Sequence, residues 1–291
     1  MGTVASHWRY PPLGYPSSQY AREEGKPMLE GARADCHVHS TWSDGEANPE
    51  EIPELARRSG LAAVAITDHY DPHAPDYRPV PGRFLDLPRL AAMIEWRDRV
   101  RTSQAGQGVR VWVGIERGPL PVPLEGATPD LVIASVHYLT EPPPTVRGRL
   151  FDEAYWRAYM QDVLRVASGP QVDVVGHMAG YLPMRSMLLP GSTFEERREI
   201  EREIARRFFI RDWYEQVFRA AAARGAACEL HCPTKSPSPD MVRLGLDTGV
   251  RFSAGSDAHI ASWIGDVGWA YDLLESLGAR PADLWAPDFD R

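Results

Sequence analysis

Histidines and carboxylates gather in short clusters along this chain, and each cluster follows a short apolar run of residues. Six of the nine histidines belong to these clusters. The clusters are Asp35-Cys36-His37-Val38-His39, Thr67-Asp68-His69, Gly114-Ile115-Glu116, Val136-His137, Gly176-His177 and Ser256-Asp257-Ala258-His259. Imidazole nitrogens mixed with carboxylate oxygens suit Zn²⁺, Mn²⁺ or Fe²⁺ better than Mg²⁺ or Ca²⁺. The clusters therefore predict a site for several metal ions, provided that the fold brings them together.

Two of the clusters place a pair of metal ligands two residues apart. Because side chains alternate along a strand, His37 and His39 are expected on one face, where one metal ion can bind both. Asp257 and His259 repeat this spacing late in the chain. Glu116 offers a carboxylate that can bridge two metals. Further ligands are expected from separate segments: His69, His137, His177 and, in the loop after the first cluster, Asp44.

The elements that must position these clusters alternate between strands and helices. Strands are expected at residues 34–39, 61–67, 109–115, 130–136, 172–176, 226–231 and 250–255. Helices are expected at about 48–60, 86–101, 151–168, 193–224, 239–248 and 271–277. Seven strands mostly separated by helices favour a parallel α/β barrel or a doubly wound sheet. In both folds, ligands bind at the carboxyl ends of the strands, which is where all six clusters fall.

The composition limits the classes of function. The net charge of −8 argues against binding of long nucleic acids by electrostatic attraction, but a metal cluster could still attract a small anionic substrate. The chain shows no signal peptide and no apolar run long enough to span a membrane, so a cytoplasmic protein is expected. Residues 1–33, rich in Pro, Tyr and Gly, are interpreted as an arm before the catalytic region at 34–291. The cysteines are expected to be buried free thiols: Cys36, Cys228 and Cys232.

The ordered set of clusters resembles the motifs of the PHP (polymerase and histidinol phosphatase) superfamily of metal-dependent phosphoesterases. The segment 35–45 is similar to the first motif, and the later motifs are matched by residues 67–69, 135–137, 175–177 and 256–259. Pro237-Ser238-Pro239-Asp240 resembles a helix start found in histidinol-phosphatase-like members. The resemblance runs from about Ala34 to Ile260. It implies a distorted TIM-like (β/α)7 barrel with a metal site at the C-terminal ends of its strands.

The resemblance also implies two or three divalent metal ions, either Zn, Mn or Fe. By this analogy one ion is held by His37, His39, Glu116 and Asp257, a second by Glu116, His137 and His177, and a third by Asp44, His69 and His259. Asp68 is expected to point away from its neighbour His69 on an extended strand.

The expected reaction is hydrolysis of a small phosphate monoester by a metal-bridging hydroxide that attacks phosphorus. Glu116, Asp257 and His231 are the expected catalytic residues, and His231 stands where many family members have Asn. The expected substrate contacts are Lys235, Arg185 and Arg117. The alternatives are a phosphodiesterase or nuclease, a metal-dependent amide or ester hydrolase, and a non-catalytic metal domain. The sequence leaves a monomer and a homo-oligomer open.

Overall fold

The strands form two parallel sheets in the computed structural model, which describes residues 29, 33–103 and 108–287. The first sheet, in the order β1-β2-β3, contains β1 (Ala34–Val38), β2 (Ala63–Ile66) and β3 (Arg110–Val113). The second, in chain order, contains β4 (Ile115–Arg117), β5 (Val132–Ala134), β6 (Val174–Val175), β7 (Ala227–His231) and β8 (Arg251–Gly255). Every pairing within these sheets is parallel, so the strands of each sheet end at the same edge.

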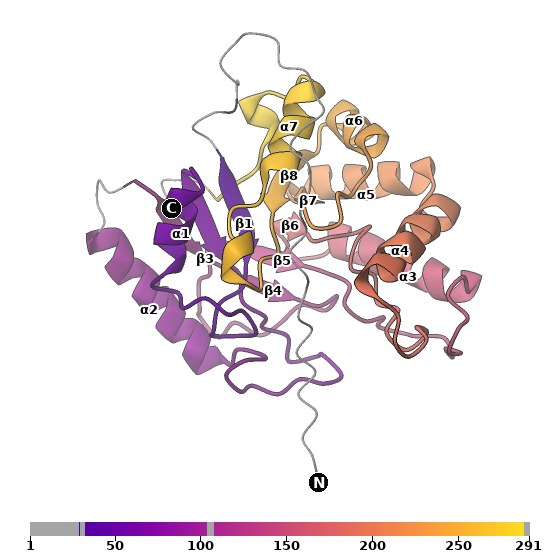
Figure 1. Cartoon of the computed structure of the whole chain (residues 1–291), viewed down its shortest axis with the longest axis horizontal. Coiled ribbons are helices and arrows are strands. Elements are labelled where there is room, and N and C mark those ends of the chain that lie inside the picture. Colours follow the sequence, from indigo (N-terminus) through magenta and orange to yellow (C-terminus); the bar gives the residue numbers. More distant parts are fainter. Residues whose placement is uncertain (1–28, 30–32, 104–107, 288–291) are drawn as a thin grey trace.

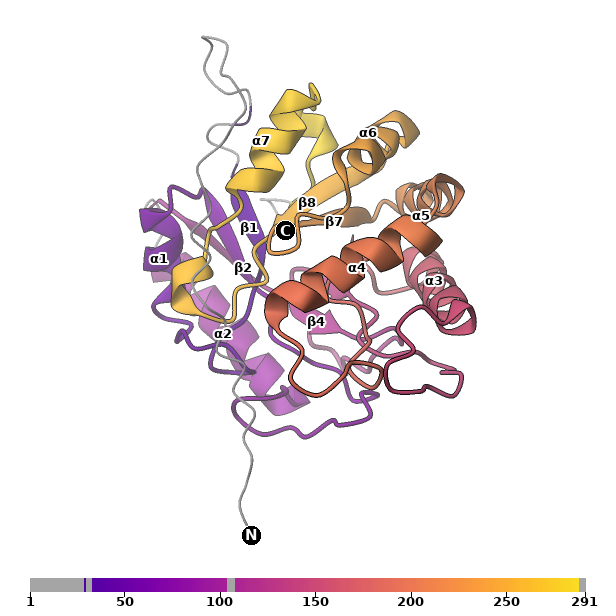
Figure 2. The same cartoon turned by 45° about the vertical axis from the view of Figure 1, so that its right-hand side comes forward.

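Helices surround the strands, which occupy the centre of the molecule (Figure 1). They are α1 (Ile52–Arg58), α2 (Leu87–Ser103), α3 (Glu153–Ser168), α4 (Phe194–Phe208), α5 (Arg211–Arg224), α6 (Pro239–Thr248) and α7 (Gly268–Ser276). Helices α1 and α2 cover one side, and α3 to α7 fan around the other (Figure 2). Within the described ranges, no helix is both long enough and apolar enough to cross a membrane.

The expected closed barrel of seven strands is not confirmed, because the described strands form two separate sheets. Single bridges between Val38 and Ala258 and between His69 and Glu116 link the sheets. The strand expected at 109–115 divides at Gly114, which packs against Leu131 so closely that a Cβ would collide with it. Before Gly114 the chain pairs with β2, and after it the chain pairs with β5. The α/β class with parallel sheets is confirmed.

The inward-facing positions of several strands change from apolar to polar toward their carboxyl ends. Trp112, Leu131, Ile133, Val174 and Ala227 belong to a buried apolar cluster between the strands. Continuing with a period of two toward the carboxyl ends, the same faces carry Glu116, Ser135, Glu229 and His231, all of which are buried. The polar groups therefore rest on an apolar floor, and a second, larger core packs the outer faces of the strands against the helices.

The single helix expected at 193–224 is two helices in the structure. The capping box that begins α4 is present as expected, with Thr193 and Glu196 bonded reciprocally. The helix ends at Phe209, whose ring lies 5.5 Å from the Tyr159 ring and 4.8 Å from the Trp213 ring. Burial of this ring draws the backbone out of helical conformation, and α5 begins two residues later.

Other expectations concern single residues and the chain ends. Cys36, Cys228 and Cys232 all lie in the described part of the chain, and they are buried free thiols as expected. The arm expected at residues 1–33 lies outside the described residues, except for Leu29 and Arg33. The first expected helix begins later than predicted, because residues 49–51 form a turn before α1.

Candidate metal centre

The nine expected metal ligands meet at the carboxyl ends of the strands. His37 lies on β1, His39 directly follows it, Glu116 lies on β4, and the remaining ligands lie in loops that follow strands. Among the residues that the structure describes, three groups have donor atoms within 4.8 Å of one another: His39, Asp44, His69 and His259; His37, His39 and Asp257; and His69, Glu116 and His137. His177 joins them through its Nε2 atom, which lies 3.1 Å from Glu116 Oε1.

Glu116 lies at the centre of the cluster, and its two carboxylate oxygens face different histidines. Oε1 lies 3.2 Å from His137 Nε2 and 3.1 Å from His177 Nε2. Oε2 faces three other nitrogens, at 3.4 Å for His37 Nε2, 3.6 Å for His39 Nε2 and 3.1 Å for His69 Nδ1. The carboxylate is therefore placed to contribute one oxygen to each of two ligand groups.

Asp257 closes the inner side of the cluster. Its Oδ1 lies 3.1 Å from His39 Nε2 and 3.6 Å from His37 Nε2, and these two nitrogens are 3.2 Å apart. The same Oδ1 lies 3.6 Å from His259 Nδ1. The spacing of two residues in both the first and last clusters thus places all four side chains near one another.

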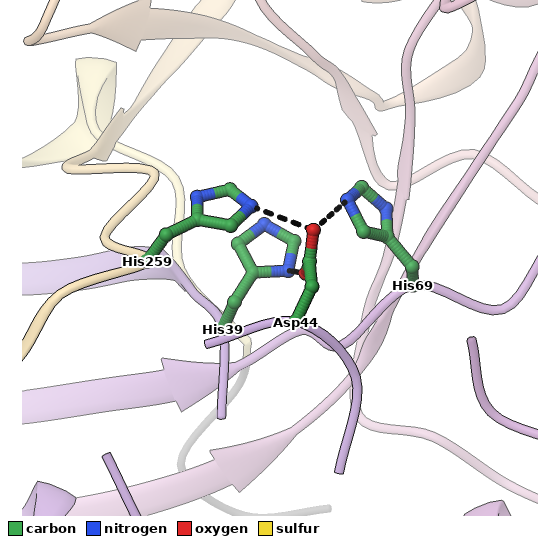
Figure 3. A group of neighbouring side chains, drawn as sticks. All are labelled: His39, Asp44, His69 and His259. Carbon is green, nitrogen blue, oxygen red and sulfur yellow. Dashed lines mark ion pairs between the residues drawn. The ribbon is translucent and has the colours of Figure 1, made fainter. Parts of the chain in front are cut away.

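Asp44 reaches back from the loop after β1 and forms the outer group. Figure 3 shows its carboxylate between the rings of His259 and His69, with Oδ2 at 3.4 Å from His259 Nε2 and 3.8 Å from His69 Nε2. Oδ1 lies 3.7 Å from His39 Nδ1. Among the described residues this buried nitrogen has no hydrogen-bond partner. Leaving it unpaired would cost free energy unless a bound group, such as a metal ion, interacts with it.

The donor set fits divalent metal ions. Four ligands at about 2.0–2.2 Å from a tetrahedral ion are separated by roughly 3.3–3.6 Å, which is close to the distances within the cluster. The pKa of the His39 imidazole is lowered to about 3 by burial and by repulsion from the nearby His259 and His69 rings. The His39 ring is therefore neutral and can donate a lone pair to a metal ion. Burial raises the pKa of the Glu116 carboxyl, but His137, His37 and His69 outweigh this effect and hold the pKa well below its usual value.

Two residues that orient ligands were not assigned roles from the sequence. The buried Glu229 carboxylate contacts His37 Nδ1 at 2.7 Å and accepts the His177 backbone N–H at 2.6 Å. Its carboxylate occupies space that Gly255 leaves free, where a Cβ would collide with Oε1. Glu229 stands at the end of an apolar run like the other clusters, and this position was the available sequence signal.

Ser135 is the second such residue. Its hydroxyl donates a 2.6 Å hydrogen bond to Glu116 Oε1, which fixes the rotation of the central carboxylate. Gly176 makes room for it, since a Cβ there would collide with Ser135 Oγ. Groups that hold metal ligands from behind commonly tune the affinity of a site.

His231 lies behind Asp257 rather than at an open surface. Its Nε2 is 3.1 Å from Asp257 Oδ2, its Nδ1 is 2.6 Å from Thr234 Oγ1, and the side chain is fully buried. Both ring nitrogens are therefore engaged within the protein. His231 is therefore placed to hold Asp257 in position, and a direct catalytic role for it stays a prediction.

The three expected substrate contacts lie in different surroundings. Arg117 does not reach the cluster: it alternates with Glu116 along β4, so it points to the opposite face, where its buried guanidinium donates to the carbonyls of Gly118, Pro170 and Gln171. Arg185, between β6 and α4, and Lys235, between β7 and α6, are both exposed in loops that follow the carboxyl ends of strands.

The parallel α/β fold and the buried imidazole–carboxylate cluster define a metal-binding enzyme, and comparison with known proteins gives its family. Residues 35–215 match the PHP domain family. A probable phosphatase of Syntrophotalea carbinolica is 30% identical over 268 residues, which cover 87% of this chain and 91% of that protein. This chain belongs to the PHP phosphoesterase family, as its motifs predicted.

Two solved structures share the fold. The histidinol phosphate phosphatase of Lactococcus lactis, complexed with Zn, L-histidinol and phosphate, has a TM-score of 0.60 at 22% identity and is matched over 85% of this chain and 94% of that chain. A putative histidinol phosphatase from Listeria monocytogenes has a TM-score of 0.54 at 15% identity, over 82% of this chain and 99% of that chain.

Proposed function

We propose that this protein is a metal-dependent phosphatase that hydrolyses a small phosphate monoester. The observation that carries the proposal is the position of Glu116, whose two oxygens face two separate sets of imidazoles. A carboxylate whose two oxygens face two ligand sets can bridge a pair of adjacent metal ions, as a two-metal site needs its ions held close together. The names of the similar proteins support the same reaction: one is a probable phosphatase, and the other was solved with zinc, L-histidinol and phosphate.

The ligands divide among two or three ions of Zn, Mn or Fe. We assign His37, His39, Glu116 and Asp257 to the first ion, Glu116, His137 and His177 to the second, and Asp44, His69 and His259 to the third. When bound, such ions lower the pKa of water toward neutrality and neutralise charge on phosphoryl oxygens.

The protein contributes by holding these ligands ready before the substrate arrives. Glu229 fixes the ring of His37, Ser135 fixes the carboxylate of Glu116, and His231 fixes that of Asp257. A preorganised site pays no reorganisation cost during the reaction.

The exposure of the ligands indicates the side from which a substrate reaches the centre. The side chains of His37 and Glu116 are 0% and 1% exposed, whereas those of Asp44, His137 and His259 are 36%, 31% and 25% exposed. The substrate is therefore expected to approach over the more exposed ligands Asp44, His137 and His259. Its phosphate is expected to bind next to Glu116 on the side that faces these ligands.

Lys235 and Arg185 are the proposed contacts for the remaining phosphoryl oxygens. A charge-assisted contact to phosphate contributes roughly 1.5–3 kcal/mol. At about 1.4 kcal/mol per tenfold, Lys235→Ala should raise KM roughly ten- to a hundredfold with a smaller effect on kcat, and Lys235→Arg should recover much of the loss. Metal content should stay unchanged, since lysine is not among the ligands. Steady-state kinetics that are unchanged in both Lys235→Ala and Arg185→Ala would refute these contacts.

A substrate panel tests the proposed reaction. Purified protein with added Mn²⁺ or Zn²⁺ is assayed on phosphomonoesters, including L-histidinol phosphate, on phosphodiesters, and on amide and carboxylic ester substrates. Release of inorganic phosphate from monoesters in large excess over the other reactions is the expected result. Preferential cleavage of diesters would identify a phosphodiesterase, and cleavage of amides or esters alone would identify a different hydrolase.

A further inference from the structure

Asp68 is a fully buried carboxylate that lies beside the centre but does not face it. Its Oδ1 accepts the backbone N–H of Ser40 at 2.8 Å and that of Ser43 at 3.1 Å. Its Oδ2 accepts the Ser40 hydroxyl at 2.6 Å, and the Ser43 hydroxyl donates to Oδ1. Both oxygens are therefore committed to two serines, which agrees with the expectation that Asp68 points away from His69.

These two serines belong to the loop that carries Asp44. The loop is compact, because the N–H groups of Ser43 and Gly45 both donate to the Ser40 carbonyl, at 3.1 and 2.9 Å. At Gly45 it passes so close to the His39 carbonyl that a Cβ would collide with it. Asp68 thus holds the loop at two points: Ser40, which begins the loop, and Ser43, which directly precedes Asp44.

The inner side of the centre has an anchor of its own. Asp35, also fully buried, accepts the Ser256 N–H at 3.0 Å and the Ser256 hydroxyl at 2.6 Å, directly before Asp257. It also accepts the Gly265 N–H at 2.9 Å. The carboxylate ligands Asp44 and Asp257 are therefore held by two different buried aspartates.

The two anchored groups differ in their contact with solvent. In the outer group the side chains of Asp44, His259 and His69 are 36%, 25% and 17% exposed. In the inner group the side chains of His37 and Asp257 are 0% and 4% exposed. The three side chains proposed to hold the third ion are partly exposed, so this ion can leave without disturbing the buried His37 and Asp257.

We infer that Asp68 is a positioning residue that sets the metal affinity of the outer group alone, and that the ion held by Asp44, His69 and His259 is the first to exchange. This inference rests on the proposed metal-dependent function. In the described part of the chain the hydrogen bonds of Asp68 go to Ser40 and Ser43, so its effect on the ion acts through the position of Asp44.

The test measures bound metal directly. Wild-type protein loaded with Zn²⁺ is dialysed against increasing chelator, and the remaining zinc per chain is determined by elemental analysis. The wild type should lose one ion at lower chelator concentration than the others. Asp68→Asn should weaken the affinity for the first ion lost by about ten- to a hundredfold, which is the usual effect of removing a group that holds a ligand. The chelator concentrations at which the other ions are lost should not change.

Two further variants separate positioning from general stability. Ser40→Ala removes the hydroxyl that donates to Asp68 Oδ2 and keeps the carboxylate, so it should show the same selective shift at smaller size even if Asp68→Asn folds poorly. Asp162→Asn is the matched control: Asp162 is buried and accepts the N–H and hydroxyl of Thr140, at 2.9 and 2.8 Å, outside the Asp44 loop. It should lower Tm without changing the first zinc loss.

The outcomes are distinguishable. If Asp68→Asn and Ser40→Ala both release zinc along the wild-type curve, or if all ions weaken together, the role of Asp68 is refuted while the proposed function stands. If wild-type protein that hydrolyses phosphomonoesters holds less than one ion per chain, the proposed function fails, and the inference fails with it.

Discussion

Glu116→Gln is expected to reduce kcat/KM for a phosphate monoester by about a thousandfold or more. The two oxygens of Glu116 face both the His137 and His177 pair and the His37, His39 and His69 side of the cluster. Loss of its charge should weaken two ion sites together. Stabilisation by metal ions is worth several kcal/mol in the transition state, and about 4 kcal/mol corresponds to a thousandfold.

The fold should survive this change. The Glu116 side chain lies above the apolar floor between the strands, and the strand pairing of β4 uses backbone groups. Circular dichroism and Tm therefore accompany the kinetic measurement. Glu229→Gln is the matched control, since Glu229 is equally buried and its hydrogen bonds among the described residues are to the His37 ring and the His177 backbone N–H. A loss of roughly ten- to a hundredfold is expected there. If Glu116→Gln were no more impaired than Glu229→Gln, the shared role of Glu116 would be wrong.

Removal of metal should abolish hydrolysis and also destabilise the protein. When the free metal concentration is a thousandfold above Kd, each bound ion stabilises the folded state by about 4 kcal/mol. For a chain of this size each kcal/mol corresponds to roughly 2–4 °C, so Tm should fall by about 10 °C or more after exhaustive chelation. Added Zn²⁺ or Mn²⁺ should restore both Tm and activity.

The control for this experiment is excess Ca²⁺, which should restore little activity because imidazole-rich sites suit it poorly. Activity that persists unchanged in protein freed of metal would contradict the account.

The convergence of the ligands could be predicted from the sequence for a physical reason. Parallel strands in a sheet end at the same edge, so residues that follow each apolar run are brought together whatever the detailed order of the strands. His37, Glu116, His177 and Asp257 are far apart in sequence, yet each is the last residue but one of a strand or lies two residues after a strand ends. The spacing of two residues in the first and last clusters added the expectation of a shared face.

Features that depend on contacts between distant segments could not be predicted in this way. The break between the sheets arises at Gly114, where the chain exchanges one pairing partner for another. The end of α4 depends on the burial of Phe209 among rings from two other helices. A local pattern of apolar residues contains neither contact.

The surroundings of the ligands show the same limit. Glu229 and Ser135 orient ligands from neighbouring strands, and each fits only because Gly255 or Gly176 leaves space on the adjacent strand. Arg117 shows the opposite error: its place beside Glu116 in sequence suggested a shared site, but alternation along β4 sends it to the other face. Register and side-chain direction, rather than sequence proximity, decide which residues act together.

Elemental analysis of catalytically active protein is the most direct test of the central claim that this centre is a multinuclear metal site. Protein purified without added chelator is divided, one part assayed for phosphate release from a monoester and the other analysed for Zn, Mn and Fe per chain. The account predicts two or three ions per chain in the active sample. Full activity with less than one ion per chain would contradict it.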